Sequence, residues 1–346
     1  MTAGNVRIED RRRSQTAATE FPRMQATIGI TAGDPAGIGL EVVLKSISSV
    51  LTSARWVLFV DRHVFERNAN RFAAGLNRRW IDDLSGITEE PVLFLHDAGG
   101  NSTGIEWGKL SREAGQRAIA YLEVAGAAAL AGHIDAIVTA PVSKEAIGKG
   151  FVGQTDFLAE RAGRTQYAMA FFAPTFKVVL ATIHVSLREA LAQISTEHYV
   201  KLIRFVDRQL QRFKFDGRRI AVAAINPHAG EGGMFGREDT DLLAPAVRQC
   251  AADGINVSGP HSADSLYYRA HSGEFDLVIA PYHDQGLIPI KLIAHGEATN
   301  VTLGLPYVRT SPDHGTAFSI AGKGEADPSG MEAALKCAVD LVRRGK

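Results

Sequence analysis

The sequence predicts an α/β protein with a mostly parallel sheet and helices on both faces. The prediction rests on short apolar runs typical of buried strands, on stretches rich in helix-forming residues, and on the alternation of the two. The 346 residues are 45% hydrophobic and 22% charged, an ordinary globular composition with ample length for a core. Two lobes that share a continuous sheet fit this pattern better than two separate domains.

Composition excludes several classes of protein. Lys+Arg and Asp+Glu both number 38, so nothing electrostatic favours a nucleic acid or an anionic membrane as partner. Cys250 and Cys337 are too few for a disulfide framework, which indicates a reducing, cytoplasmic compartment. No apolar run reaches the roughly 18 residues of a membrane span, so none is expected.

The first 24 residues differ from the rest. Met1–Arg23 is polar and lacks the apolar core of a secretory signal. We expect a disordered extension ahead of one folded unit of two interleaved lobes at residues 25–346. A basic binding or targeting arm is an alternative, as is a true start at Met24.

In the first half of the chain, strands and helices follow one another. Ala26–Thr31 is predicted to be a strand, Gly33–Gly39 a turn and Glu41–Ser48 a helix. Ser111–Gly132 is rich in alanine, the best helix former, and Ser111 is a suitable N-cap. Further strands are expected at Trp56–Val60, Pro91–Leu95 and Ile134–Thr139.

The second half continues the pattern. Ala168–Ala173 and Val178–Ile183 are predicted to form a hairpin about a Pro-Thr turn. Asn300–Gly324 is rich in Gly, Thr and Pro and is expected to form loops around a site. The remaining predicted elements are helix Thr196–Phe213, strand Ile220–Ile225, helix Asp239–Asp253, strand Leu277–Ala280 and helix Gly330–Arg343.

Three histidines are the strongest functional signal. His184, His228 and His283 each follow an apolar run that reads as a buried strand. Residues where parallel strands end lie at the ligand-binding edge of an α/β sheet. Three neutral imidazoles converging there would bind a divalent metal and leave positions open for a substrate. Taken singly, each is as readily a loop or core residue; the repeated context favours the metal.

Charged residues near these motifs are further candidates. Asp284 could orient a metal-bound His283 or transfer a proton, or simply cap a turn. Asp264 is as readily a helix N-cap as a functional acid. Lys291 and Arg309 suit a carboxylate or phosphate, unless they are only surface charges.

Three other features have both a functional and a purely structural interpretation. Lys144, after the strand Ile134–Thr139, is either a site residue or the solvated start of a helix. The Gly33–Gly39 turn could bring backbone N–H groups to an anion, or be a plain turn. The Gly-x-Gly-x-x-Gly match at Gly148–Gly153 follows a helical segment rather than a strand, which favours a chance match.

Taken together, five motifs resemble the 4-hydroxythreonine-4-phosphate dehydrogenase (PdxA) family, and they run in family order from about Ala26 to the C-terminus. They are Gly-Asp-Pro-Ala-Gly-Ile-Gly at Gly33, Thr-Ala-Pro-Val-Ser-Lys at Thr139, Asn-Pro-His-Ala-Gly-Glu-Gly-Gly at Asn226, Tyr-His-Asp-Gln-Gly at Tyr282, and the eighteen-residue run from Asn300 to Ala317.

The resemblance implies a two-lobed α/β/α sandwich like isocitrate and isopropylmalate dehydrogenases, not a standard Rossmann domain. It implies a homodimer with its active site between subunits and one divalent metal, such as Zn, Mg, Co or Mn, on His184, His228 and His283. Substrate contacts would be Gln154, Thr155, Lys291, Asn300 and Arg309. Catalytic groups would be Lys291, Asp284 and Asp264. NAD, with NADP as the alternative, would contact Asn300, Leu303, Gly304, Asp313 and Gly315.

The implied reaction oxidises the secondary hydroxyl of 4-phosphooxy-L-threonine and decarboxylates the resulting β-keto acid to 3-amino-2-oxopropyl phosphate, a step of vitamin B6 synthesis. A metal would polarise the hydroxyl and stabilise the alkoxide as hydride leaves for NAD.

One position departs from the family pattern: Gln154 replaces the usual histidine and cannot become cationic. Alternative substrates are therefore 4-phosphothreonate, 4-phosphoerythronate or the carboxylated cis-dihydrodiol of terephthalate. A binding protein without activity on the same scaffold is the remaining alternative.

Overall fold

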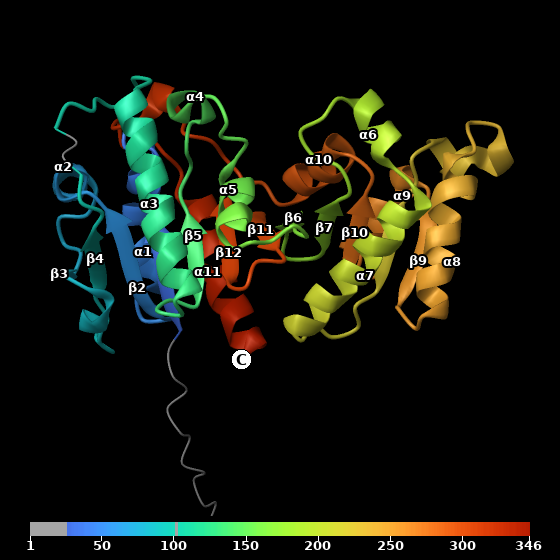
Figure 1. The fold of residues 1–346 in the computed structure, drawn as a ribbon, viewed down its shortest axis with the longest axis horizontal. Helices are drawn as coiled ribbons and strands as arrows, with labels where there is room; N and C mark the ends of the chain where they lie inside the picture. Colours follow the sequence, from blue (N-terminus) through green and yellow to red (C-terminus); the bar gives the residue numbers. More distant parts are fainter. Residues whose placement is uncertain (1–25, 101–102) are drawn as a thin grey trace, which may run out of the picture.

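The computed structural model describes residues 26–100 and 103–346, so the predicted extension and the alternative start at Met24 lie outside the described residues. Within these two ranges, twelve strands form one sheet in the order β3-β4-β2-β1-β5-β12-β11-β6-β7-β10-β8-β9 (Figure 1). The strands are β1 (Thr27–Thr31), β2 (Arg55–Val60), β3 (Arg78–Ile81), β4 (Leu93–Asp97), β5 (Ala136–Thr139), β6 (Ala168–Phe172), β7 (Lys177–Leu180), β8 (Ile220–Ala223), β9 (Val257–His261), β10 (Leu277–Ala280), β11 (Thr299–Leu303) and β12 (Val308–Pro312).

Two parallel blocks of strands make up this sheet. Strands β3, β4, β2, β1, β5 and β12 run parallel in one block, and β7, β10, β8 and β9 run parallel in the other. Between them, β11 pairs antiparallel with β12 and β6, and β6 pairs antiparallel with β7. The expected mostly parallel sheet is confirmed, and β11 and β6 join its two lobes.

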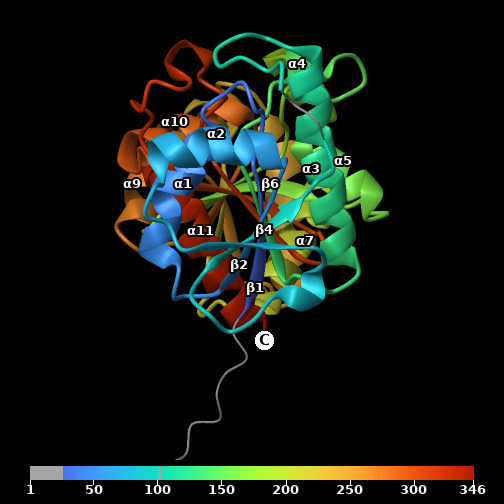
Figure 2. The ribbon, with the colours of Figure 1, turned by 90° about the vertical axis from the view of Figure 1, so that its left-hand side faces the viewer.

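Helices cover both faces of the sheet. In Figure 2, α1 and α11 lie on one side of the strands and α3 and α5 on the other, which gives three layers. The helices are α1 (Gly39–Val50), α2 (Arg62–Phe72), α3 (Arg112–Leu130), α4 (Lys144–Ile147), α5 (Gln154–Arg161), α6 (Leu187–Gln193), α7 (Thr196–Arg212), α8 (Ala244–Ala252), α9 (Ala263–His271), α10 (His283–Ile293) and α11 (Ser329–Gly345).

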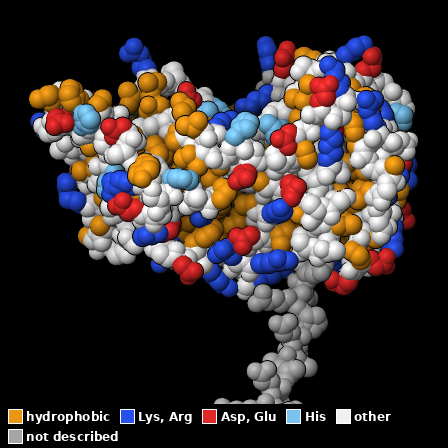
Figure 3. Space-filling view, turned by 180° about the vertical axis from the view of Figure 1, so that it is seen from behind, with side chains coloured by type: hydrophobic (Ala, Val, Ile, Leu, Met, Phe, Trp, Pro, Cys, Tyr) orange, Lys and Arg blue, Asp and Glu red, His pale blue; other side chains and the backbone are white. Residues whose placement is uncertain are grey.

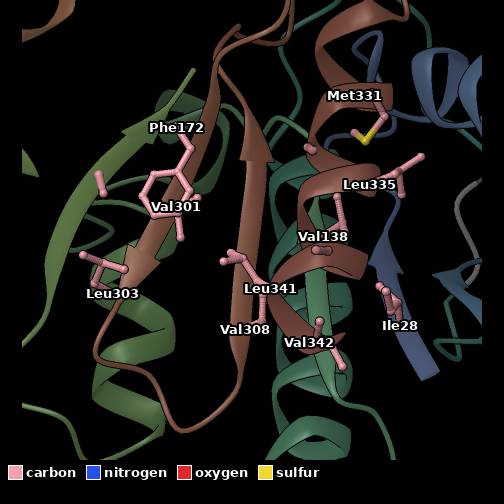
Figure 4. Close-up of a cluster of buried hydrophobic side chains, with 14 of the residues drawn as sticks. Ile28, Val138, Phe172, Val301, Leu303, Val308, Met331, Leu335, Leu341 and Val342 are labelled. Carbon is pink, nitrogen blue, oxygen red and sulfur yellow. The ribbon is translucent and has the colours of Figure 1, made fainter. Parts of the chain in front are cut away.

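The C-terminal helix α11 packs across the middle of the sheet. Its residues Met331 and Leu335 are fully buried, as is Val138 of β5 (Figure 4). Val308 of β12 and Val301 of β11 belong to the same apolar cluster. Burial of this face holds β12 and β11, the strands at the junction of the lobes, in place.

Most predicted elements are present within one to three residues of their expected ends. The β6–β7 hairpin is confirmed, with Phe172 opposite Lys177. Ser111 is the N-cap of α3 and accepts a hydrogen bond from the backbone N–H of Ala114. The helix expected at Asp239–Asp253 begins instead as a π-helical turn, Asp239–Leu243.

The prediction of loops over Asn300–Gly324 is wrong for residues 300–303 and 308–312, which are strands, and is confirmed for residues 313–324, which are irregular and border the cavities described below. This region supplies β11 and β12, two central strands. Its buried residues include Thr302, Arg309 and Thr310, whose polar groups bond to one another or to the backbone. These polar residues interrupt the apolar run that is typical of a central strand, although both strands are buried. Helices α2, α6 and α10 and strands β3 and β9 were also not predicted.

Cys250 and Cys337 are both free thiols. Of the helices in the described part of the chain, none is long and apolar enough to cross a membrane.

Replacement of Leu335 by alanine should lower the free energy of unfolding by about 2–5 kcal/mol, because it opens a cavity between α11 and the sheet. Chemical denaturation measures the change. Lys336→Ala, at the exposed neighbouring position, is the control and should leave the midpoint nearly unchanged. Equal effects of the two substitutions would contradict the packing described for α11.

Candidate active site

A cavity of about 450 Å³ lies between the two lobes and is lined by segments of both. Figure 3 shows the hollow at the upper edge of the molecule. Its walls come from the segment after β5, the start of α5, the segment after β7, helix α10, and strands β11 and β12. Nine of the predicted site residues line it: Gln154, Thr155, His184, His283, Lys291, Asn300, Arg309, Asp313 and Gly315.

Arg309 of β12 is the most unusual group in this cavity. Its side chain is 3% exposed, yet its hydrogen-bond partners are neutral hydroxyls. Nη1 donates to Thr302 at 3.0 Å and to Thr155 at 3.2 Å, and Nη2 donates to Thr139 at 2.7 Å. No carboxylate pairs with the guanidinium among the residues that the structure describes.

The sheet brings these groups together. Arg309 stands beside Ile137 in the β12–β5 register, next to Thr139 at the end of β5. Burial lowers the pKa of Arg309 to about 10, so the guanidinium remains charged at neutral pH. Thr155 and Thr302 also hydrogen-bond to each other at 3.3 Å, so one of these two hydroxyls donates to the other. Thr139 and the remaining hydroxyl keep their O–H groups for a ligand. The arrangement therefore combines one uncompensated positive charge with hydroxyl donors, which suits an anion.

Gln154 and Asn300 add neutral polar groups to the same cavity. Gln154 Nε2 donates to the Ala140 carbonyl at 3.2 Å, and a carbonyl only accepts, so the orientation of the amide is determined. Asn300 Oδ1 is buried without a hydrogen-bond partner in the described part of the chain. Gln154 therefore contributes a polar group but no charge to this wall of the cavity.

His184 and His283 both line the cavity, and their ring centroids are 5.9 Å apart. Nδ1 of His283 lies 2.7 Å from Oδ1 of Asp284, which leaves Nε2 of His283 available to a ligand. Burial, followed by the positive charges of Lys144 and His283, lowers the pKa of His184 and favours its neutral form. The neutral form of His184 is the one that metal binding needs.

His228 does not join this pair within one chain. It lies in the turn Pro227–Gly233 (η2), where five successive residues from His228 to Gly232 have positive φ. Its side chain is 59% exposed, and its Nδ1 lies 4.0 Å from Oδ2 of Asp264. Within residues 26–100 and 103–346, no three His, Cys, Asp or Glu side chains come close enough to hold a metal. One chain thus presents two imidazoles inside the cavity and a third at the surface.

The donor set still fits a divalent metal. His283–Asp284 and His228–Asp264 are both imidazole–carboxylate neighbours, the usual arrangement around metal-binding histidines. His184 and His228 both have positive φ, of 51° and 52°. Non-glycine residues adopt this conformation infrequently because it strains the backbone, and strained residues are often found at functional sites. What one chain lacks is a third imidazole beside the other two.

A second cavity, of about 280 Å³, adjoins the first and shares Lys291, Asp313 and His314 with it. Lys291 Nζ lies 3.1 Å from Asp313 Oδ2 at this junction. His314 Nε2 is buried there and has no partner among the described groups. Gly296 and Gly330 line the wall, and a Cβ on Gly296 would lie 2.7 Å from Ser329 Oγ.

Two predicted cofactor residues are not brought to either cavity. Leu303 is 1% exposed and packs in the core (Figure 4). Gly304 has φ of +100°, and a Cβ there would lie 2.5 Å from the Gln166 carbonyl. The strand register explains the position of Leu303 and Gly304. Leu303, at the end of β11, lies opposite Ala168 at the start of β6, away from the cavities. His314 and Asp327, which were not among the predicted site residues, line the second cavity instead.

Lys144, for which the sequence left a site role as one of two alternatives, and Asp156, which was not selected, also line the first cavity. Tyr167 donates to Asp156 Oδ1 at 2.8 Å, and burial raises the pKa of Tyr167 to about 12. The only sequence signal for Lys144 was its place after a strand, and for Asp156 its place in a polar turn.

Comparison with solved structures establishes the class of fold. A β-decarboxylating dehydrogenase of Thermococcus kodakarensis is 16% identical and matches 92% of this chain and 84% of its own length with a TM-score of 0.51. The expected two-lobed fold of the isocitrate and isopropylmalate dehydrogenases is therefore confirmed.

The chain belongs to the PdxA family, whose model, described as pyridoxal phosphate biosynthetic protein PdxA, matches residues 52–338. The 4-hydroxythreonine-4-phosphate dehydrogenase of Sulfurihydrogenibium sp. is 36% identical over 323 residues, 91% of this chain and 98% of that protein. The D-threonate 4-phosphate dehydrogenase of Salmonella typhimurium is 37% identical over 323 residues, 91% and 99% of the two chains. The structure of 4-hydroxythreonine-4-phosphate dehydrogenase from Klebsiella pneumoniae, 36% identical, matches 93% of this chain and 99% of its own with a TM-score of 0.84. The protein is thus an oxidoreductase of the dehydrogenase type.

Replacement of Arg309 by glutamine should lower kcat/KM at least about a hundredfold, chiefly through KM, because the cavity loses its buried cation. Steady-state kinetics measure the change, and a thermal melt checks the fold. Arg248→Gln, on the exposed face of α8, is the matched control and should have no effect. Equal KM values for the two variants would exclude Arg309 as an anion-binding group.

Proposed function

We propose that this protein is an NAD- and divalent-metal-dependent dehydrogenase that oxidises the secondary hydroxyl of 4-phosphooxy-L-threonine. The β-keto acid formed would lose CO2 and give 3-amino-2-oxopropyl phosphate, a step of pyridoxine synthesis. Two of the relatives described above carry the corresponding name, 4-hydroxythreonine-4-phosphate dehydrogenase.

The observation that carries this proposal is the buried guanidinium of Arg309. A positive charge with only threonine hydroxyls as partners is unfavourable in an empty cavity and favourable once an anion arrives. The phosphate or carboxylate of the substrate would supply that anion. Fixing one end of the substrate in this way orients its hydroxyl for reaction.

The second cavity is the place we propose for NAD. It meets the substrate cavity at Lys291, Asp313 and His314, so hydride would pass between the two compartments there. The buried, unpartnered Nε2 of His314 offers a polar contact to the cofactor. Lys291, held 3.1 Å from Asp313, is the group that we assign to substrate positioning and proton transfer.

We assign the divalent cation to His184 and His283, with His228 as third ligand. When bound, it would supply Lewis-acid polarisation of the substrate hydroxyl. Asp284 holds His283 by its Nδ1 and so directs Nε2 into the site. Because His228 is exposed and distant from the pair, we propose that it serves the site of a second copy of the chain.

Exposed apolar side chains support such a homodimer. Of the twelve large hydrophobic residues that are exposed in the described part of the chain, nine lie on the segments that follow or surround the three histidines. Figure 3 shows apolar side chains along the upper rim of the lobe at the left. These nine residues, the apolar rim, are Val185, Leu187, Leu191, Met234, Phe235, Tyr268, Ile288, Leu292 and Ile293.

A second candidate substrate is 4-phosphothreonate, which carries a hydroxyl where 4-phosphooxy-L-threonine carries an ammonium group. Gln154 favours it, because this neutral amide is fixed by Ala140 where the family usually has a histidine. The chemistry of oxidation and decarboxylation would be unchanged. The curated relative from Salmonella typhimurium is named for a substrate of this kind.

NADH formation by metal-supplemented protein should be fastest with 4-phosphooxy-L-threonine among four substrates that include 4-phosphothreonate, 4-phosphoerythronate and the terephthalate dihydrodiol. A chelator should abolish turnover, and a divalent metal should restore it, because the imidazole pair then regains its cation. Faster reaction with 4-phosphothreonate would select the second candidate. No NADH from any of the four would contradict the proposed activity.

Mixing inactive His184→Ala and His228→Ala proteins should restore about a quarter of the wild-type activity, since half of the dimers are then mixed and each has one intact site. This result requires that His228 act across the dimer. If all three ligands came from one chain, no mixed dimer would hold a complete site and activity would stay absent.

Replacement of Leu292, 83% exposed on α10, by lysine should give a monomer without dehydrogenase activity, because a complete site needs two chains. Sedimentation measures the state of assembly. Leu130→Lys, 45% exposed on α3, is the control and should remain a dimer.

A further inference from the structure

Lys144 is a cation in the substrate cavity that the proposed mechanism does not yet use. It begins α4 directly after β5, and the side chain of Ser143 caps that helix by accepting the N–H of Ala146. Its side chain lines the first cavity together with Arg309. Lys144 is thus both the exposed first residue of α4 and part of the cavity lining.

The backbone that carries Lys144 is held tightly by the turn at Gly33. Asp34 N–H donates to the Pro141 carbonyl at 2.9 Å. Gly33 has φ of +73°, and a Cβ there would lie 2.5 Å from the same carbonyl oxygen, so only glycine allows this approach. Gly39 packs on Ala140 in the same way, with its hypothetical Cβ 3.2 Å from the Ala140 Cβ.

The buried carboxylate of Asp34 strengthens this connection. It is 1% exposed and accepts the backbone N–H of Ala36 at 2.9 Å. Burial raises its pKa, against the opposing effect of backbone hydrogen bonds from Ala36 and Ser143. The motif Gly33–Gly39 therefore acts as a scaffold that fixes the segment before Lys144.

Lys144 keeps its charge available to a ligand. Lys144 Nζ and Asp156 Oδ2 both lie beside Gly153. A Cβ added to Gly153 would be 3.9 Å from the former and 3.3 Å from the latter. Asp156 is engaged by the hydroxyl of Tyr167 through its other oxygen. In the described portion of the chain, Lys144 makes no ion pair within 4.0 Å. The cavity thus contains two cations without carboxylate partners: Arg309, buried and rigid, and Lys144, exposed on a fixed backbone.

We propose that Lys144 is a second anion anchor, which binds the anionic end of the substrate that Arg309 does not hold. The inference rests on the proposed function, whose substrates carry a phosphate at one end and a carboxylate at the other. Neutral Gln154 leaves the neighbouring position without charge, so Lys144 supplies the positive partner on that side of the cavity. A flexible ammonium group accepts either phosphate or carboxylate.

Lys144→Gln should raise KM for the best substrate about tenfold to hundredfold and change kcat less than about threefold, since one charged contact is lost from binding. Lys144→Arg should recover most of the affinity. Lys149→Gln, at an exposed lysine five residues further along that does not line the cavity, is the control and should match wild type. Thermal melts of all variants check the fold. Equal KM values for Lys144→Gln and Lys149→Gln would overturn the proposal.

Calorimetric titration of the metal-loaded protein with inorganic phosphate and with D-glycerate distinguishes the two anionic ends without any turnover. Weaker binding of phosphate alone in Lys144→Gln assigns Lys144 to the phosphate, and weaker binding of glycerate alone assigns it to the carboxylate. Unchanged affinity for both, or no binding of either to the wild type, would refute the anchor. Because no oxidation is involved, this result stands even if the substrate assignment fails.

Discussion

A charged guanidinium buried without a carboxylate is the constraint around which the centre of this protein is arranged. The hydrogen-bond partners of Arg309 are threonine hydroxyls from β5, from α5 and from β11, and its buried Nε has no partner in the described part of the chain. Three separate elements must therefore meet at one point, at the junction of the two lobes. An isolated buried charge is unfavourable, so the energy that stabilises this arrangement comes from the surrounding core, above all from α11 packed on β12 and β5. The core therefore holds the Arg309 guanidinium in the wall of the cavity, where it can bind an anion.

The same constraint explains which parts of the fold could be predicted from sequence. Strands β1 and β10 are short apolar-rich runs, and helices α7 and α11 have apolar residues at helical spacing, so they were predicted well. Strands β11 and β12 were taken for loops, because Thr302, Arg309 and Thr310 are polar. Their partners come from elsewhere in the chain, and no local pattern reports such contacts. Local reasoning finds strands that are buried in an apolar environment and misses those that line a polar site.

The candidate site was also predicted only in part from the sequence. The short motifs identified the imidazoles of His184 and His283, whose strands β7 and β10 are neighbours in one parallel block. They could not show that His228, after β8, turns through five left-handed residues and stays at the surface beside Asp264. We infer that this histidine, with the apolar rim around it, is matched to a second copy of the chain rather than to its own cavity. Folding of one chain and assembly of two would then both be needed for a complete site.

The most direct test of this account is a crystal structure of the protein with metal and 4-phosphooxy-L-threonine in the absence of NAD. We predict one anionic end of the substrate within hydrogen-bond distance of Arg309 and Thr155, and a metal ion on His184 and His283 with a third imidazole from a second copy. A substrate bound with both anionic ends away from Arg309 would contradict the central claim, whatever the position of the metal.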